Sequence, residues 1–365
     1  MRISFVAANL NSGGAERVMS LLANQFIKSG YEVEFIFLKK DIRFYPLLQQ
    51  VKVKVAEKEC DSDSLIKKLL WMRKYIGNNK PDAIFAFRIA IYSVTLLTLL
   101  GVKVPVIASE RNDPRFYSLA WKAIQAALLP LANHFVVQTQ QIKDYFPKFI
   151  QKKTDIIFNP VTEKVFSLSI VPKEKRIISV GRLHSQKNQK MMIEAFARVS
   201  EKFPQWSLII FGEGPEREAL EKMIEDYSQS SSARQSRFKI QDKVSLPGRS
   251  ENIIEELNKS EIFAFSSDYE GMSNAVVEAF CVGLPIITTR VSGTEDIITN
   301  GKNGYLLERN DVDGMEKAMG KLMGDEKLRR EMGEYNKSKA NLFEIEHISK
   351  QWENALKKVV YNKDL

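Results

Sequence analysis

Two glutamates, Glu270 and Glu278, lie eight residues apart in the stretch SSDYEGMSNAVVEAFCVGLPIITT. The preceding residues, EIFAFSS, predict a strand, and Ser273 or Asn274 is a suitable helix N-cap. One carboxylate would therefore precede the helix, and the other would lie about two turns further on. The N–H groups between them favour an anion, so the spacing suits a phosphate with sugar hydroxyls on either side. A paired general acid and base is the competing interpretation, and the positive helix end between the carboxylates makes it less attractive.

Two cations, Arg182 and Lys187, lie in the segment GRLHSQKN directly after the apolar strand RIISV. Arginine can bind a diphosphate through two parallel hydrogen bonds, and lysine can bind it as a point charge. A solvated basic loop is the ordinary alternative. The position at the carboxyl end of a predicted strand favours function, because open parallel sheets bind ligands at that edge.

Glycine-containing loops follow three other predicted strands. Gly13 and Gly14 lie in NSGGAER before a helix, where glycine lets backbone N–H groups approach an anion. Gly212 follows the strand WSLIIF, and Arg249 follows KVSLPG. Each loop could be a plain turn, or it could hold a flat base through backbone groups. The segment NSGGAER matches neither GxGxxG nor GxxxxGK[ST], so neither of those phosphate-binding motifs is supported.

The loops belong to a chain in which short apolar strands alternate with helical segments. Strand, loop, helix and strand follow one another within about forty residues at the start, which is the pattern of a parallel sheet. The pattern restarts after the linker-like segment NPVTEKVFSLSIVPKEK. We therefore expect two doubly wound α/β domains, residues 1–170 and 171–345, and a closing helix over about 346–365.

Composition limits the class of protein. The 365 residues carry a formal charge of +9, and residues 1–170 hold 24 Lys+Arg against 14 Asp+Glu, a net of +10. The remaining residues hold 30 Lys+Arg against 31 Asp+Glu, a net of −1, so the basic excess belongs to the first half. The two cysteines, Cys60 and Cys281, do not predict a disulfide framework and fit a reducing compartment. The start has no signal-peptide pattern, and the apolar segment 89–100 is too short to span a bilayer, so we expect it to be a buried helix.

These motifs together resemble the retaining family-four glycosyltransferases of the GT-B fold. The resemblance covers nearly the whole chain and is strongest over residues 176–308. It rests on NSGGAER, SVGRLHSQKN, FGEGPER, LPGR and, above all, SSDYEGMSNAVVEAFCVGLPIITT with its Glu-x7-Glu spacing. The resemblance implies two facing Rossmann-like domains with an interdomain cleft, an N-terminal acceptor domain and a C-terminal donor domain, with the closing helix packing back on the first.

The resemblance also implies roles for the residues. Glu270 would contact the donor sugar and Glu278 the ribose, while Arg182 and Lys187 would hold the diphosphate and stabilise it as a leaving group. The expected catalytic residues are Glu270, Arg182 and Lys187. The full expected nucleotide-sugar site also includes Gly13, Gly14, Gly212, Arg249, Gly271, Met272, Ser273, Asn274 and Glu278. No cofactor and no metal are expected, because no D-x-D motif lies in a plausible donor loop.

One departure from that family concerns the first domain. Many relatives carry a histidine near the donor sugar, whereas the corresponding strand end here reads SERNDP. Glu110 and Arg111 would then position the sugar or the acceptor. This version is similar to members of bacterial capsule, O-antigen and lipid-linked oligosaccharide pathways, which implies a hexose or N-acetylhexosamine donor, UDP by analogy, and a polyprenyl-diphosphate-linked or oligosaccharide acceptor.

The basic first half predicts contact with an anionic membrane. Two basic amphipathic segments, DSLIKKLLWMRKYIG and RFYSLAWKAIQAALLPLANHF, could lie in the interface of an anionic leaflet, or could pack into the domain with solvated lysines. We expect a cytoplasmic protein that docks peripherally at the inner face of the membrane. A nucleotide-sugar 2-epimerase of the same fold is the alternative enzyme. A nucleic-acid-binding protein is the alternative from another class, and no recognition motif supports it, so no nucleic-acid partner is expected.

Overall fold

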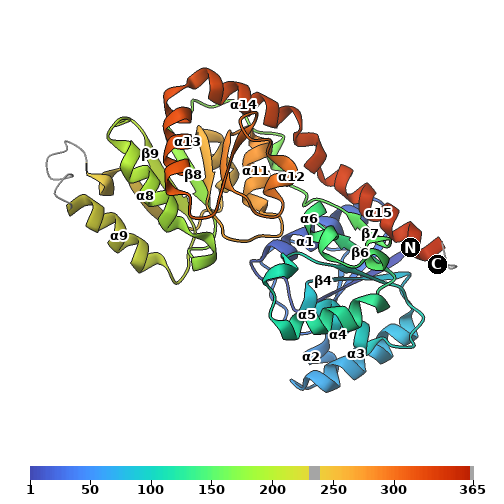
Figure 1. Cartoon of the computed structure of the whole chain (residues 1–365). Helices are drawn as coiled ribbons and strands as arrows, with labels where there is room; N and C mark the ends of the chain where they lie inside the picture. The colour runs from blue at the N-terminus through green and yellow to red at the C-terminus, as the bar shows by residue number, and fades with distance from the viewer. Residues whose placement is uncertain (230–238, 362–365) are drawn as a thin grey trace. The chain divides into compact units, whose positions relative to one another are not determined.

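The structure, a computed structural model, describes residues 1–229 and 239–361 and divides into two compact units (Figure 1). The first unit comprises Met1–Thr162 and Phe343–Leu365, and the second comprises Glu163–Leu342. The division thus falls at Thr162, where the sequence suggested residue 170. The final helix, α15 (Ile345–Tyr361), counts with the first unit, and residues 362–365 of the expected closing helix lie outside the described residues.

The described part of the first unit contains a parallel sheet of seven strands in the order β3-β2-β1-β4-β5-β6-β7. The strands are β1 (Arg2–Ala7), β2 (Glu32–Phe37), β3 (Lys52–Val55), β4 (Ala83–Phe87), β5 (Val106–Ser109), β6 (His134–Val137) and β7 (Thr154–Ile156). Besides α15, the helices are α1 (Gly14–Lys28), α2 (Ala56–Glu59), α3 (Leu65–Asn79), α4 (Ile89–Thr98), α5 (Leu119–Leu128), α6 (Gln140–Tyr145) and α7 (Lys148–Gln151).

The second unit contains, in its described residues, a six-stranded parallel sheet in the order β10-β9-β8-β11-β12-β13. The strands are β8 (Arg176–Val180), β9 (Ser207–Phe211), β10 (Val244–Gly248), β11 (Ile262–Phe265), β12 (Ile286–Thr289) and β13 (Gly304–Leu307). The helices are α8 (Gln189–Ser200), α9 (Arg217–Gln229), α10 (Ile253–Lys259), α11 (Asn274–Val282), α12 (Thr294–Ile297), α13 (Val312–Gly324) and α14 (Glu326–Ser338). The predicted pair of doubly wound α/β domains is confirmed.

The strands read as continuous apolar runs because helices cover both faces of each sheet. All five residues of β4, AIFAF, are buried, as expected for a central parallel strand. The segment expected to be a buried apolar helix is α4. Within the described ranges, no helix is long and apolar enough to cross a bilayer.

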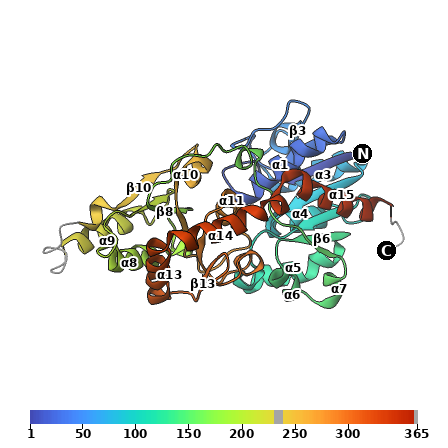
Figure 2. The ribbon, with the colours of Figure 1, turned by 90° about the horizontal axis from the view of Figure 1, so that it is seen from above.

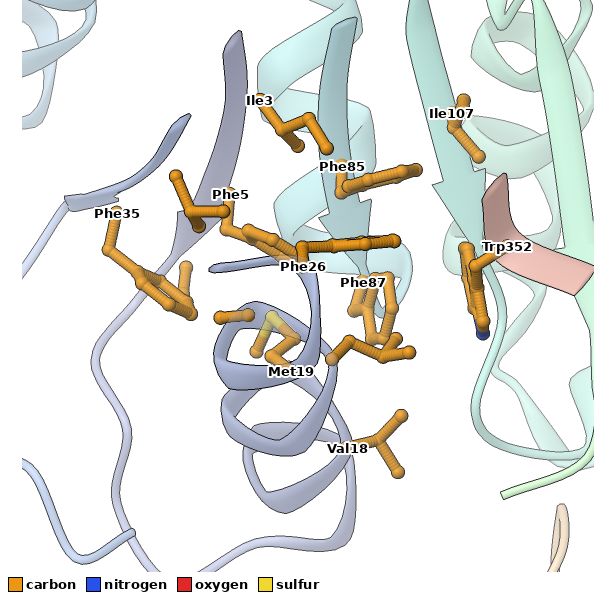
Figure 3. Close-up of a cluster of buried hydrophobic side chains, with 14 of the residues drawn as sticks. Ile3, Phe5, Val18, Met19, Phe26, Phe35, Phe85, Phe87, Ile107 and Trp352 are labelled. Carbon is orange, nitrogen blue, oxygen red and sulfur yellow. The ribbon is translucent and has the colours of Figure 1, made fainter. Parts of the chain in front are cut away.

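Helix α15 joins the first unit through aromatic packing. Trp352 is fully buried, and its ring lies 5.2 Å from that of Phe87 in a stacked arrangement and 5.5 Å from that of Phe85 edge-on. Figure 3 shows these rings in one cluster with Phe5 and Phe26. Aromatic pairs of this kind contribute about 0.5–1.5 kcal/mol beyond their buried area. Seen from above in Figure 2, α15 lies beside α1, which supplies Phe26.

An ion-pair network ties the same helix to the edge of the sheet. The Nζ of Lys358, on α15, lies 2.7 Å from Asp155 Oδ2 on β7, and His134 Nε2 on β6 lies 2.9 Å from the same oxygen. The hydrogen bond from His134, followed by that from Lys358, lowers the pKa of Asp155 to about 2. The Asp155 carboxylate therefore stabilises the folded unit only while it is ionised.

We predict that this contribution disappears in acid. Because the pKa of Asp155 is lower in the folded than in the unfolded chain, its stabilisation is complete above about pH 4 and is lost as the pH falls toward 2. Asp155→Asn should lower the free energy of unfolding by about 1–2 kcal/mol at pH 6 and by about half as much at pH 3. Thermal melts from pH 6 to pH 3 measure this, with Asp63→Asn, an exposed carboxylate of the same unit, as the control. A difference between wild type and Asp155→Asn that stays constant over this range contradicts the prediction.

Candidate functional site

The two loops that the sequence singled out in the second unit meet at the carboxyl edge of its sheet. Strands β8 and β11 are far apart in the sequence but are hydrogen-bonded neighbours in the sheet. Their strand-end loops therefore lie side by side. Lys187 of the first loop forms an ion pair with Glu270 Oε1 of the second, and each side chain is 14% exposed. The structure brings together two of the three residues that we expected to be catalytic.

Only one oxygen of the Glu270 carboxylate, Oε1, accepts hydrogen bonds from the described residues. Besides Lys187, the Ser267 hydroxyl donates to Oε1 at 3.1 Å, and the Gln186 amide donates to the same oxygen at 3.4 Å. Among the described residues, none donates a hydrogen bond to Oε2 of Glu270. One oxygen therefore orients the side chain, and the other remains available to accept a hydrogen bond from a ligand hydroxyl.

Backbone contacts connect the two loops. The Ser266 hydroxyl donates to the backbone oxygen of Lys187 at 2.9 Å, and the Asp268 N–H donates to the backbone oxygen of Gln186 at 2.9 Å. The Lys187 ammonium also lies 4.8 Å from the centre of the Phe265 ring, a cation–π distance. These contacts fix the position of the Lys187 ammonium at the strand edge before any ligand arrives.

The other two predicted cations are exposed. Arg182 follows β8 and Arg249 follows β10, and both side chains face solvent. Within the described part of the chain, the Arg182 guanidinium makes no hydrogen bond or ion pair. It retains all its donors for an anion, whereas Lys187 already shares its charge with Glu270.

The helix that follows Glu270 is α11, and it begins as predicted. Ser273 is its N-cap residue, but its side chain forms no capping hydrogen bond. Gly271 and Met272, which link Glu270 to the cap, are buried, and Asn274 is the first helical residue. Glu278 lies in the second turn and is only 2% exposed, so it is deeper than Glu270. The order of carboxylate, helix N-terminus and second carboxylate agrees with the predicted arrangement, while the ligand roles of these residues stay predictions.

The backbone conformation and the close contacts at position 212 require glycine. It adopts φ +150°, and a Cβ at this position would lie 1.8 Å from the carbonyl oxygen of Gly181. Its N–H donates to the backbone oxygen of Gly248 at 2.8 Å. The loops after β8 and β9 therefore touch backbone to backbone. The N–H of Gly212 is thus used within the chain and helps to bring the two loops together, while a contact of Gly212 with a nucleotide stays a prediction.

In the first unit, the predicted glycine loop surrounds a carboxylate. Gly13 precedes α1 and Gly14 begins it. Glu16 folds back so closely that a Cβ on Gly13 would lie 2.1 Å from Glu16 Oε2. Glu16 Oε1 also lies 3.0 Å from the guanidinium of Arg88, which ends β4 with φ +72°. A carboxylate of the chain itself thus occupies the start of α1, where we expected a bound anion.

Glu110 and Arg111, predicted to position the sugar or the acceptor, are both buried after β5. Glu110 is fully buried, and its carboxylate accepts hydrogen bonds from Tyr117 at 2.7 Å, Tyr92 at 2.9 Å and Gln125 at 3.1 Å, as well as from two backbone N–H groups. Burial raises the pKa of Glu110, and these hydrogen bonds oppose the rise. With both oxygens occupied, Glu110 is placed to support the loop rather than to contact a substrate. Arg111 differs, because its guanidinium has no hydrogen-bond partner.

Sequence reasoning missed three polar residues at these edges: Arg88, Gln186 and Ser267. The last two lie within or directly after motifs that were recognised, so their place at a strand end could have indicated them. Arg88 could not be found in this way, because its contact with Glu16 joins segments 72 residues apart. Among the described residues, no group of three or more His, Cys, Asp or Glu side chains could hold a metal ion.

Comparison with known proteins accounts for both units. Residues 12–164 match the model of Glycosyltransferase Family 4, and residues 160–339 match that of Glycosyl transferases group 1. A Campylobacter jejuni protein named GalNAc-alpha-(1->4)-GalNAc-alpha-(1->3)-diNAcBac-PP-undecaprenol alpha-1,4-N-acetyl-D-galactosaminyltransferase is 27% identical, and the match covers 96% of this chain and 97% of the relative. The amylovoran biosynthesis glycosyltransferase AmsD of Erwinia amylovora is 25% identical over 95% of this chain and 96% of its own.

Solved structures share the fold. The Anabaena protein HepE in complex with UDP superposes with a TM-score of 0.82 at 17% identity, covering 98% of this chain and all of that one. TarM of Staphylococcus aureus superposes with a TM-score of 0.78 at 13% identity, covering 97% and 99%. With a family 4 domain, a group 1 domain and the fold of such proteins, the chain belongs to the GT-B glycosyltransferases of the family-four type.

Proposed function

We propose that this glycosyltransferase is a retaining enzyme that moves a hexose or N-acetylhexosamine from a UDP-sugar to a polyprenyl-diphosphate-linked glycan. The observation that carries the proposal is the Lys187–Glu270 pair at the carboxyl edge of the second sheet, with one Glu270 oxygen left for a sugar hydroxyl. The names of the Campylobacter relatives, which act on undecaprenol-diphosphate-linked glycans, support the acceptor class. The UDP in HepE supports the nucleotide.

The chemistry assigned to each residue follows from its charge and surroundings. Departure of UDP from the sugar leaves negative charge on the diphosphate, which Arg182 and Lys187 stabilise. Glu270, oriented by Lys187 and Ser267, accepts hydrogen bonds from sugar hydroxyls. In the retaining reaction, the acceptor attacks on the face from which UDP leaves, and the departing phosphate oxygen takes the acceptor proton. No protein nucleophile is required.

Substitution of these residues tests the assignment. Arg182→Ala, Lys187→Ala and Glu270→Gln should each lower kcat/KM by the loss of about 2–4 kcal/mol of transition-state stabilisation. Because Lys187 and Glu270 form one pair, their double substitution should cost less than the sum of the two single ones. Glu278→Gln should mainly weaken nucleotide binding. The control is Lys190→Ala, an exposed lysine of the neighbouring helix.

The assay uses a panel of UDP-sugars, first scored by thermal shift and then by UDP release with a lipid-linked acceptor. Wild-type kinetics in the first three variants would remove the assignment of these loops. Conversion of the UDP-sugar without any acceptor would instead identify an epimerase.

We also predict that transfer proceeds without a metal ion. Two cations, Arg182 and Lys187, are placed to neutralise the charge that a divalent ion would otherwise neutralise. Turnover in EDTA should therefore equal turnover in untreated buffer. Loss of activity in EDTA that Mg²⁺ or Mn²⁺ restores, and Ca²⁺ does not, contradicts this prediction.

The first unit carries the surface that we propose for membrane contact. On α3, Ile66 and Leu70 lie one turn apart and are 71% and 62% exposed, with Lys67 and Lys74 exposed beside them. Not every apolar residue of the segment DSLIKKLLWMRKYIG is exposed, because Met72 is buried in the core. Lys68 is not exposed either, since it is buried in an ion pair with Glu57.

Helix α5 adds a second exposed apolar group. Leu119 is 85% exposed, and Trp121 and Ile124 are 37% and 38% exposed, beside Lys122. Both α3 and α5 contact α4, so the two groups lie on the same side of the first sheet (Figure 1). Apolar residues beside lysines suit the interface of an anionic leaflet.

Liposome co-sedimentation measures this association. Wild type should sediment with anionic vesicles, less so at high salt, and only weakly with zwitterionic ones. The variant Ile66→Ser/Leu70→Ser/Leu119→Ser should remain in the supernatant. Ile170→Ser, a fully exposed apolar residue of the second unit, is the control. Equal, salt-insensitive recovery of wild type in the supernatant with both lipids contradicts the docking proposal and leaves the transferase proposal intact.

A further inference from the structure

Three buried hydrogen-bond donors on one face of the first sheet have no partner among the described residues. They are the Ser109 hydroxyl, the Trp352 indole N–H and the Arg111 guanidinium, here called the donor cluster. Ser109 pairs with Phe87 across the strands β5 and β4, and Trp352 stacks on Phe87. The Arg111 Cζ lies 4.8 Å from the centre of the Phe87 ring and 6.0 Å from that of Trp352. The aromatic rings therefore gather the donor cluster at the carboxyl end of the sheet.

Figure 3 shows how Trp352 contributes to this arrangement. Its indole nitrogen points toward the end of the sheet where Phe87 lies, and away from Phe85. The donor cluster therefore lies at the edge where parallel sheets bind ligands, not in the middle of the core.

Of the three members of the donor cluster, Arg111 costs the most free energy to bury. It is 7% exposed, and all three guanidinium nitrogens are buried without a hydrogen-bond partner. Stacking on aromatic faces offsets part of the desolvation but satisfies no N–H group. Burial lowers the pKa of Arg111 to about 9, so the side chain is still charged at neutral pH. A buried guanidinium whose N–H groups lack acceptors is costly, and an anion that accepts hydrogen bonds from it would offset that cost.

The charge of the neighbouring Glu110 opposes the effect of burial on the Arg111 pKa, but its carboxylate accepts no hydrogen bond from the guanidinium. Both oxygens of Glu110 are occupied by Tyr92, Tyr117, Gln125 and the backbone. Gln138, which follows the next strand, has an unpartnered Oε1, but this amide oxygen carries no charge and forms no hydrogen bond with Arg111. The donor cluster is thus positive and rich in N–H and O–H groups, which suits a phosphate oxyanion.

We propose that the donor cluster binds a phosphate oxyanion, with Arg111 as its charged member and Ser109 and Trp352 as neutral donors. This inference rests on the proposed function, which offers two sources of that chemistry: the diphosphate of the nucleotide and the diphosphate of the prenyl-linked acceptor. Arg111 is then a substrate-binding residue of the first unit, and Glu110 is the positioning residue that holds its loop.

The ligand-free protein provides the first test. Arg111→Met removes a buried guanidinium whose N–H groups have no acceptor among the described residues and keeps the apolar stem, so it should raise Tm by a few degrees. The matched control is Arg329→Met in the second unit. Arg329 is 5% exposed, but it hydrogen-bonds to Glu261 and to two backbone carbonyls, so its loss should lower Tm. If Arg111→Met lowers Tm as Arg329→Met does, Arg111 is an ordinary structural residue and the proposal fails.

Ligand-induced shifts of Tm provide the second test and identify the source. The probes are UDP and farnesyl diphosphate, each compared with its uncharged counterpart, uridine or farnesol. In wild type, at least one diphosphate should raise Tm beyond its counterpart, and Arg111→Met should clearly reduce that increment, while Arg182 and Lys187 can still contribute to the increment from UDP. A reduced UDP increment indicates the nucleotide, and a reduced farnesyl diphosphate increment indicates the acceptor. Unchanged increments in Arg111→Met, or no increment in wild type, overturn the proposal.

A second variant covers the case in which Arg111→Met does not fold. Arg111→Lys keeps the charge but loses the planar fork, so it should retain only part of the increment. A full increment in Arg111→Lys together with an undiminished kcat/KM overturns the proposal. Sugar transfer by wild type that is unaffected in Arg111→Met would reject this inference alone. Arg111-dependent binding of a diphosphate in a protein that transfers no sugar would reject the proposed function alone.

Discussion

The ion pair between Lys187 and Glu270 is the interaction on which the arrangement of the second unit's site depends. It joins the loops after β8 and β11, which are neighbours in the sheet although 83 residues separate the paired side chains. Removing both charges from water costs free energy, and further hydrogen bonds from Gln186 and Ser267 offset part of this cost. Such a pair is a poor way to stabilise a fold. It is an effective way to hold a carboxylate and an ammonium at fixed positions beside a ligand.

The close contact between the loops after β8 and β9 has the same consequence. Because Gly212 has no Cβ, the backbone of its loop can contact Gly181. This contact supports the loop that bears Arg182 and Lys187. A side chain at position 212 would push this loop out of place. Preorganisation of charged groups, rather than their mere presence, is what makes electrostatic stabilisation of a leaving group effective. The close contact at Gly212 and the ion pair therefore serve one purpose, which is to fix the Lys187 ammonium at the sheet edge.

The sequence was sufficient for features that depend on local pattern. Apolar runs of strand length, each followed by a glycine or polar loop and a helix, predicted both parallel sheets and placed Glu270, Lys187 and the α11 N-terminus at a strand edge. The sequence could not show contacts between distant segments. The burial of Lys68 against Glu57 and the saturation of Glu110 by Tyr92 and Gln125 depend on how helices pack on the sheet. Periodicity identifies an apolar face, but packing decides which of its residues remain exposed, as Ile66 and Met72 show.

The cations of the two units differ in whether they have a hydrogen-bonded partner. In the second unit, Lys187 has a carboxylate partner, so the diphosphate that we propose there would have to share this existing interaction. In the first unit, Glu16 and Arg88 form an ion pair, whereas Arg111 has no hydrogen-bond partner in the described part of the chain and lies against the rings of Phe87 and Trp352. An unpartnered buried guanidinium gains more from an anion than a paired ammonium does, because binding removes a penalty that the ligand-free fold carries. The contrast places the stronger demand for an anion in the first unit, in the donor cluster beside Phe87 and Trp352.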